Sequence, residues 1–189
     1  ADYYEFTLAA GDTATLALTV QAAGNLSLEL RDSTDAVLAT GTGGATNQTK
    51  SISSFVASTG GTYYARVTGD SNAAYSLILM NNAGLDTEPN DSFTAAQAIH
   101  LSQKKVLGFL SLGPNGGPNE DWYSIDVTST GSLLELTTNT PGDGPNQLVN
   151  TLHPHIELYD PSNALVASGS ALPDGRNESI QYRPLVTGA

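Results

Sequence analysis

The chain has 189 residues, of which 39% are apolar and 14% are charged, and this composition supports a packed core in one or two domains. It contains no cysteine, which excludes disulfides, thiolate metal sites and a cysteine nucleophile. Nineteen acidic residues against seven basic ones give a net charge of −12, which argues against binding to nucleic acids or anionic membranes and is compatible with divalent cations. Membrane insertion is not expected either, because no apolar run approaches the roughly 20 residues of a spanning helix.

Apolar and polar residues alternate along most of the chain, and a period of two predicts β-strands. Glycine, asparagine, aspartate and serine cluster between the alternating sets, where they favour turns. Short strands without a long helical pattern predict an antiparallel β-sandwich. In chain order, the alternating sets lie at residues 4–8, 16–20, 26–30, 63–67, 75–79, 123–127, 134–136 and 156–158.

One segment near the middle of the chain breaks this alternation. Residues 91–99 predict a short helix that Asp91 caps and that turns Phe93 and Ile99 inward. Residues 81–85, shortly before it, are polar and contain one glycine, and they predict a linker between two neighbouring domains.

The sequence also repeats itself at domain length. Residues 28–32 and 36–39 both recur 128 positions later, and residues 2–6 recur 119 positions later. A period of this length indicates a domain, because solenoid units are only about 20–50 residues long. We therefore predict two incomplete copies, residues 1–82 without the N-terminal segment of the copy and residues 83–189 without its last strands.

Two acidic patches stand close to the predicted boundary between the copies. The first lies within residues 86–91, and the second lies within residues 119–121 at the entrance of a predicted strand. Calcium takes six to eight oxygen ligands in flexible geometry, and a local run of such side chains supplies several of them. A sandwich can bring the two patches together. The alternative interpretation is a helix cap and a turn whose remaining carboxylates are solvated.

No residue pattern points to catalysis. Serine has no Gly-x-Ser-x-Gly context, so we expect no catalytic residue and no enzymatic activity. His153 and His155 can face one ion in an extended segment. No third ligand is close in sequence, and a structural or solvent-facing role is favoured for the pair. Trp122 is expected to pack in the core or under the helix rather than to contact a ligand.

Several motifs taken together resemble the bacterial pre-peptidase C-terminal domain family. They lie at residues 88–99, 121–123 and 156–160, and residues 60–67 resemble the closing strand of that family. The resemblance implies an all-β fold of tandem jelly-roll-like antiparallel β-sandwiches, with one short helix in the second. Members are non-catalytic accessory modules of secreted bacterial proteins, and relatives in clostridial collagenases bind collagen and hold calcium near the N-terminal segment of the domain.

The resemblance also implies a calcium site and a class of function. We expect a module of a secreted or cell-surface protein that acts as a spacer, an adhesion unit or a substrate-binding unit, with collagen, a polysaccharide or another protein as its partner. Two other hypotheses are a self-assembling extracellular subunit that exchanges strands and a part of a secreted peptidase whose catalysis resides elsewhere. The implied calcium ligands are Asp86, Glu88, Asn90, Asp91 and Asp121, with Glu120 as an additional candidate.

Overall fold

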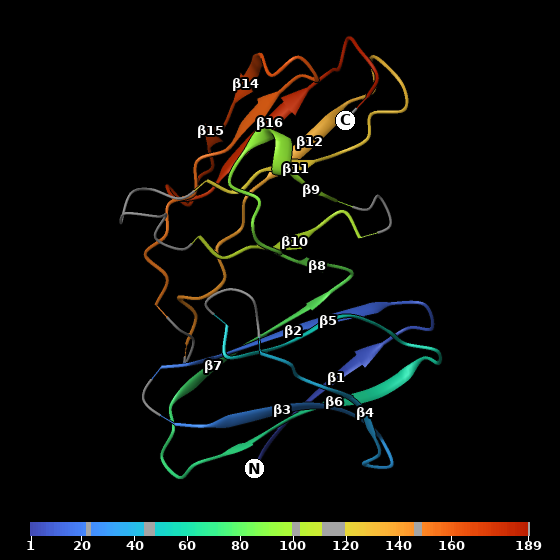
Figure 1. The fold of residues 1–189 in the computed structure, drawn as a ribbon, viewed down its shortest axis with the longest axis vertical. Helices are drawn as coiled ribbons and strands as arrows, with labels where there is room; N and C mark the ends of the chain where they lie inside the picture. The colour runs from blue at the N-terminus through green and yellow to red at the C-terminus, as the bar shows by residue number, and fades with distance from the viewer. Residues whose placement is uncertain (22–23, 44–47, 100–102, 111–119, 146–148, 189) are drawn as a thin grey trace. The chain divides into compact units, whose positions relative to one another are not determined.

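The computed structural model describes residues 1–21, 24–43, 48–99, 103–110, 120–145 and 149–188. Internal contacts divide the chain into two compact units, Ala1–Tyr123 (unit 1) and Ser124–Ala189 (unit 2). Both units are built from β-strands, which confirms the predicted all-β class (Figure 1). The predicted boundary between residues 82 and 83 refers to the two sequence repeats, and it stays a prediction. The compact units divide the chain elsewhere, since residues 83–123 belong to unit 1.

Unit 1 contains two antiparallel sheets with one core between them. The first sheet has the strand order β1-β6-β3-β4 and the second has the order β5-β2-β7, both drawn in blue to green in Figure 1. This arrangement confirms the predicted antiparallel β-sandwich. The strands are β1 (Asp2–Leu8), β2 (Thr13–Val20), β3 (Leu26–Asp32), β4 (Val37–Thr40), β5 (Lys50–Val56), β6 (Gly61–Gly69) and β7 (Tyr75–Asn81).

The core of unit 1 comes from alternate residues of its strands. Leu16 and Leu18 of β2, and Leu28 and Leu30 of β3, are each 0% exposed. Successive side chains of a strand point to opposite faces, so the alternation in the sequence places these leucines between the sheets. Burial of each such side chain contributes roughly 2 kcal/mol, which makes the sandwich a firm support for the segments that follow β7.

The segment predicted as a linker packs onto β2, so that prediction was wrong. Ala83 is fully buried, and its carbonyl accepts a hydrogen bond of 2.5 Å from the buried Thr15 hydroxyl. The Thr13 amide donates to Asn82 Oδ1 at 2.9 Å. Residues 82–85 are therefore held in place because they satisfy polar groups of β2 that would otherwise lack partners.

Two short strand pairs follow in unit 1. In the first, β8 (Gly84–Leu85) runs parallel to β10 (Val106–Leu107). In the second, β9 (Gln97–Ala98) pairs with β11 (Tyr123–Ser124). Both pairs involve residues on either side of the first acidic patch, so they fix its ends.

The helix predicted over residues 91–99 is wrong in length and in its cap. Phe93–Ala95 forms one 3-10 turn, and its N-cap is Ser92, which makes no side-chain capping bond. The chain then extends into β9 because the Gln97 amide donates to the Trp122 carbonyl at 2.9 Å. A residue engaged in strand pairing cannot continue a helix, so tertiary pairing overrides the local helical pattern.

Unit 2 is smaller and has fewer buried side chains. Ile180, which is 2% exposed, and Pro184 are buried, and the other apolar side chains described in this unit are half-buried or exposed. One sheet has the order β12-β16-β15, and a separate hairpin pairs β13 with β14. The strands are β12 (Leu134–Thr137), β13 (Glu157–Tyr159), β14 (Leu165–Ser168), β15 (Ser170–Ala171) and β16 (Glu178–Tyr182).

Candidate metal centre

Backbone pairing brings the two acidic patches together within unit 1. Asp86 follows β8, and its amide donates to the Leu107 carbonyl of β10 at 3.0 Å. The Trp122 amide donates to the Asn90 carbonyl at 2.8 Å, so the segment entering β11 runs along the first acidic patch. Asp121 immediately precedes Trp122 and is thereby placed beside Asp86 and Asn90. Strand pairing, rather than a continuous loop, assembles this cluster.

Gln97 of β9 holds the backbone on both sides of Asp86. Its Nε2 atom donates to the Leu85 carbonyl at 2.9 Å, and its Oε1 atom accepts from the Thr87 amide at 2.8 Å. The residues before and after Asp86 are therefore fixed to the same side chain. This clamp restricts the direction in which the Asp86 carboxylate can point.

Phe93 and Trp122 cover one side of this region. Their rings lie edge to face, with centroids 5.9 Å apart and planes at 88°. This packing supports the predicted structural role of Trp122. It also anchors the strand entrance that carries Asp121.

Three carboxylates converge in the cluster. Oxygen atoms of Asp86, Glu88 and Asp121 all lie within 4.8 Å of one another. Asp86 is 3% exposed, Glu88 and Asp121 are half-buried, and the neighbouring Asn90 is 0% exposed. The cluster is therefore a largely buried concentration of negative charge rather than a solvated acidic surface.

Hydrogen bonds position one atom of each side chain and leave another atom unused. The Tyr123 hydroxyl donates toward Asp86 Oδ1 and Asp121 Oδ2, at 3.0 and 3.3 Å. Asn90 donates from Nδ2 to Asp86 Oδ1 at 2.9 Å and from its amide to Glu88 Oε2 at 3.0 Å. Within this cluster, four buried oxygens have no hydrogen-bond partner among the described residues: Asp86 Oδ2, Glu88 Oε1, Asn90 Oδ1 and Asp121 Oδ1.

The cluster is electrostatically unfavourable by itself. Two like charges about 5 Å apart repel by roughly 3 kcal/mol at an effective dielectric constant near 20. Burial, together with the charges of Asp86 and Glu88, raises the pKa of Asp121 to about 6. Burial, together with the carboxylates of Asp86 and Asp121, also raises the pKa of Tyr123, so its hydroxyl stays protonated as a donor.

The set of unpartnered atoms fits a hard divalent cation. All four are oxygens, three come from carboxylates, and calcium takes six to eight such ligands with water completing the set. Buried polar atoms in folded proteins almost always have partners, so four adjacent exceptions need an explanation. A bound cation would satisfy the four oxygens and reduce the repulsion among the carboxylates. Asp86, Glu88, Asn90 and Asp121 are the residues that would hold it.

The structure separates the six predicted ligands into two groups. Asp86, Glu88, Asn90 and Asp121 contribute the four unpartnered oxygens. Asp91 and Glu120 are exposed, and neither belongs to the converging set. The Trp122 indole nitrogen lies 3.4 Å from Glu120 Oε2, which draws that carboxylate toward the surface. The charge of Asp91 still acts on the cluster, since it contributes to the raised pKa of Asp121.

Sequence reasoning missed three residues that shape the cluster. Tyr123 could have been identified, because it stands two positions after Asp121 in an extended segment and so shares its face. Gln97 and Gly108 carry no such signal. A Cβ atom at Gly108 would lie 2.9 Å from the Tyr123 hydroxyl and 3.6 Å from Asp121 Oδ2, so this position admits no larger residue without displacing them.

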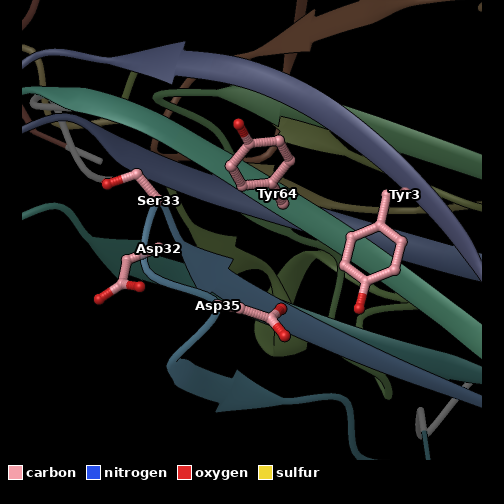
Figure 2. A pocket seen from close by; sticks show the side chains of 5 residues that line it. All are labelled: Tyr3, Asp32, Ser33, Asp35 and Tyr64. Carbon is pink, nitrogen blue, oxygen red and sulfur yellow. The ribbon is translucent and has the colours of Figure 1, made fainter.

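A second candidate site is a pocket of about 310 Å³ on the outer face of the first sheet. Tyr3 of β1 and Tyr64 of β6 present their rings, and Asp32, Ser33 and Asp35 line the turn after β3 (Figure 2). Tyr3 is 49% exposed. The pocket thus combines aromatic surface with carboxylate and hydroxyl groups, a combination suited to a polar ligand.

Neighbouring side chains orient the two tyrosines of this pocket. The Arg66 guanidinium lies 5.8 Å from the centre of the Tyr3 ring. The Tyr64 hydroxyl donates to Glu5 Oε2 at 3.2 Å, and this bond raises the pKa of Tyr64. Both rings are therefore held against the sheet by polar contacts at their edges or faces.

His155 of unit 2 contacts two carboxylates. His155 Nδ1 lies 2.9 Å from Glu178 Oε2, and His155 Nε2 lies 3.7 Å from Glu157 Oε1. Among the described residues, no cluster of three metal-ligating side chains includes His153 or His155.

The fold and the cluster define a class of protein: a β-sandwich with a buried group of acidic oxygens held beside it. Residues 1–69 match the family model of the bacterial pre-peptidase C-terminal domain, so β1 to β6 are similar to that family. The match ends before β7 and before the acidic cluster. No curated protein matches the chain. Within the described ranges, no helix is long and apolar enough to cross a membrane.

Proposed function

We propose that the chain is a calcium-stabilised, non-catalytic β-sandwich module of an exported bacterial protein, acting as a spacer, an adhesion unit or a substrate-binding unit. The observation that carries the calcium site is the set of four buried, unpartnered oxygens on Asp86, Glu88, Asn90 and Asp121. The family match of residues 1–69 supports the module and its secreted or cell-surface location. The acidic composition is also compatible with a calcium-containing medium.

Calcium in this cluster would act as a cross-link within unit 1. Asp86, Glu88 and Asn90 belong to the segment after β8, whereas Asp121 belongs to the segment entering β11. A ligand that binds only the folded state stabilises it by about 2.7 kcal/mol when its concentration is 100 times the dissociation constant. The module would therefore be rigid in calcium and looser without it, as suits a spacer or an adhesion unit outside the cell.

Calcium titration tests the proposal directly. We expect the melting temperature of the full chain to rise with calcium concentration, because the ion binds the folded cluster. Asp121→Asn should remove most of this rise. Without calcium, the same variant should melt at a slightly higher temperature than the parent, because it removes one of three mutually repelling carboxylates.

Asp91→Asn is the matched control for this experiment. It removes the same charge from a carboxylate that also acts on the cluster, but Asp91 is exposed and contributes no buried unpartnered oxygen. Its calcium response should stay close to that of the parent chain. An equal loss of response in Asp91→Asn and Asp121→Asn would mean that general acidity, and not this cluster, binds the ion. A parent chain without any response would remove the calcium site altogether.

Ligand binding by the module is proposed for the pocket of Tyr3 and Tyr64. Exposed aromatic rings beside carboxylates and hydroxyls suit an extended polar polymer such as a polysaccharide or collagen. We expect Tyr3→Ala combined with Tyr64→Ala to abolish co-sedimentation with whichever of these polymers binds the parent chain. Tyr4→Ala is the matched control, because Tyr4 is 43% exposed on the same strand but does not line the pocket. If only Tyr4→Ala loses binding, the polymer binds at a site other than this pocket.

A further inference from the structure

The outer face of the first sheet carries an ordered set of aromatic and charged side chains. Two neighbouring rows of directly opposed residues cross β1, β6 and β3, and each row contains one tyrosine, one arginine and one glutamate. The rows are Tyr3–Arg66–Glu29 and Glu5–Tyr64–Arg31. Residues two positions apart in a strand share a face, so the two rows form one surface, and the pocket of Tyr3 and Tyr64 lies on it.

Glu29 binds both arginines of this surface. Its Oε2 atom lies 2.7 Å from Arg31 Nη2 and 2.8 Å from Arg66 Nη1. Arg31 Nη1 also pairs with Asp35 Oδ1 at 3.0 Å and donates to the Asp35 carbonyl at 2.7 Å. Both guanidinium groups are thus engaged within the sheet face, and an anionic ligand would have to compete with Glu29 for them.

The carboxylates around the pocket exceed the cations available to them. Asp32 Oδ1 accepts the hydrogen bonds of the turn, and Glu5 Oε2 accepts from the Tyr64 hydroxyl. Among the described residues, neither of these carboxylates has an ion pair, and Asp35 shares its arginine with Glu29. The hydroxyl and the amides of the turn lower the pKa of Asp32, so it stays charged at neutral pH. The fold therefore compensates only part of the negative charge at the pocket.

The aromatic rings of the pocket suit a ligand of positive charge. The Arg66 guanidinium lies 5.8 Å from the centre of the Tyr3 ring, so this surface already holds a cation against one ring. Within the described ranges, no arginine or lysine lies over the Tyr64 ring in this way. The rings and the carboxylates of Asp32 and Asp35 line the same pocket (Figure 2). Both kinds of group attract cations, the rings through their faces and the carboxylates through their charge.

We propose that this pocket binds a basic side chain, lysine or arginine, of an extended polypeptide partner. This assignment rests on the proposed function, in which the pocket of Tyr3 and Tyr64 is the ligand site, and adds the charge of the ligand. The aliphatic stem of the basic side chain would lie along the tyrosine rings, and its charged end would meet Asp32 and Asp35. The net charge of −12 would add attraction at longer range.

A polypeptide is favoured over a polysaccharide as the source of this charge. Lysine and arginine present a cation at the end of a flexible apolar stem, which matches aromatic surface beside carboxylates. A neutral sugar polymer would place hydroxyls against Asp32 and Asp35 but would leave their charge uncompensated.

Two blocked peptides test the proposal with the full chain: one alternates glycine and lysine, and the other alternates glycine and glutamine. We expect the lysine peptide to bind roughly tenfold more tightly, the size of an exposed ion pair together with a cation–π contact. NMR titration that follows the ring resonances of Tyr3 and Tyr64 gives both dissociation constants. The advantage of the lysine peptide should shrink at high salt, because salt screens exposed charges.

Asp35→Asn should weaken binding of the lysine peptide by about threefold, because it removes one exposed ion pair. The turn should keep its shape, since Asn163 has the same left-handed conformation at the corresponding position of the β13–β14 hairpin, with φ of 63° against 66° at Asp35. Asp126→Asn is the matched control. It removes the same charge from an exposed aspartate that does not line the pocket, so its affinity should equal that of the parent chain.

The outcomes separate the charge of the ligand from the location of its site. Equal binding of the two peptides would overturn the preference for a cation; if Tyr3→Ala with Tyr64→Ala abolishes that binding, the pocket remains the ligand site. Lysine-peptide binding that survives this double substitution would overturn the pocket itself. An equal loss in Asp35→Asn and Asp126→Asn would overturn the proposal in favour of attraction by net charge. No binding of either peptide would also overturn it, and co-sedimentation with collagen or a polysaccharide would then decide the proposed function separately.

Discussion

The β3–β4 hairpin and the β13–β14 hairpin have the same turn but different surroundings. In each, an aspartate at the end of the first strand (Asp32) or directly after it (Asp160) accepts three hydrogen bonds through one oxygen. The residue at the tip of the turn has a positive φ, 66° at Asp35 and 63° at Asn163. The distances agree closely. In the first turn, Asp32 Oδ1 accepts from Thr34 N at 2.8 Å, Thr34 Oγ1 at 2.7 Å and Ala36 N at 3.0 Å. In the second turn, Asp160 Oδ1 accepts from Ser162 N at 2.9 Å, Ser162 Oγ at 2.6 Å and Ala164 N at 3.0 Å.

The exits of the two hairpins agree as well. The Gly41 amide donates to the Leu28 carbonyl at 2.7 Å, and the Gly169 amide donates to the Ile156 carbonyl at 2.8 Å. A Cβ atom at either glycine would collide with a neighbouring side chain, that of Leu28 at Gly41 and that of Glu178 at Gly169. Glycine is therefore required in both places by close approach of the chain.

The difference between the hairpins lies in what covers them. Leu30 is 0% exposed, whereas its counterpart Leu158 is half-buried. Turn geometry depends on a few neighbouring residues and is the same in both units. Burial depends on β6 and β7, which are distant in sequence. Local hydrogen bonding can thus be complete in a hairpin whose apolar face is only partly covered.

The largest effect that would sharpen this comparison is expected from one substitution made in both hairpins. Leu30→Ala should lower the free energy of unfolding of unit 1 by about 2–5 kcal/mol, because it leaves a cavity in a closed core. Leu158→Ala should cost unit 2 less than about 1.5 kcal/mol, because solvent already reaches that position. Native-state hydrogen exchange at the amides of β3 and β13 reports the two units separately. Equal costs of Leu30→Ala and Leu158→Ala would contradict this difference in burial.

A smaller and matched effect is expected from the turn aspartates. The hydroxyl of Thr34 and the amides of the turn lower the pKa of Asp32, and the hydroxyl of Ser162 and the corresponding amides lower the pKa of Asp160. A carboxyl whose folded pKa is below its unfolded value stabilises the fold above that unfolded value, near 3.9, and loses this contribution as pH falls through the folded pKa. Both hairpins should therefore weaken together in acid.

Asp32→Ala and Asp160→Ala test whether the two turns are equivalent. Each substitution removes an acceptor of three hydrogen bonds, so the melting temperatures of the two units should fall by similar amounts at neutral pH. In each variant, the acid sensitivity of the altered hairpin should also diminish. If only Asp32→Ala lowers the melting temperature, the turn at Asp160 contributes little to the stability of unit 2.

These elements also show what the sequence could predict. Alternation predicted the strands and the sandwich, because period two in the sequence is the period of a strand. Residues 28–32 and 36–39 recur 128 positions later, and both places form a hairpin with the same turn bonds. Local carboxylate density and a strand entrance predicted that two acidic patches could meet, and the family resemblance implied the individual residues, which include the four that converge in the acidic cluster.

The incorrect predictions arise from contacts between segments that are distant in sequence. The helix over residues 91–99 has a helical pattern, but pairing of Gln97 with the strand entrance ends it after one turn. Asp91 and Glu120 carry carboxylates, as calcium ligands do, but both side chains are exposed and lie outside the converging set. The clamp by Gln97 and the close approach at Gly108 arise from segments that are distant in sequence, and one sequence contains no signal for either.

The smallest expected effect concerns an interaction that unit 1 lacks. Position 155 is histidine and position 178 is glutamate, where the shift of 128 places Ser27 and Lys50 in unit 1. The hydrogen bond to Glu178 raises the pKa of His155, and the same bond lowers the pKa of Glu178. Because the pKa of His155 is raised in the folded chain, His155 stabilises the fold fully at a pH below the unfolded pKa, near 6.5. This stabilisation is lost as pH rises through the folded pKa. Because the pKa of Glu178 is lowered in the folded chain, the stabilisation by Glu178 is lost as pH falls through that folded pKa.

Unit 2 should therefore be most stable in mildly acidic solution. Unit 1 lacks this pair, and its own dependence on pH in this range should come from Asp121, whose raised pKa means that the fold weakens as pH rises through about 6. NMR titration of the His155 ring would give its pKa in the folded chain, and hydrogen exchange at β16 would follow the stability of unit 2 from pH 5 to pH 8. His155→Gln should flatten that dependence in unit 2 and leave the amides of β5 unaffected. The effect should be modest, because the His155 side chain is 59% exposed and solvent screens the pair. A ring that titrates at the ordinary pKa of histidine would show that the pair is not formed in solution, and β16 would then have no advantage over β5 in mildly acidic solution.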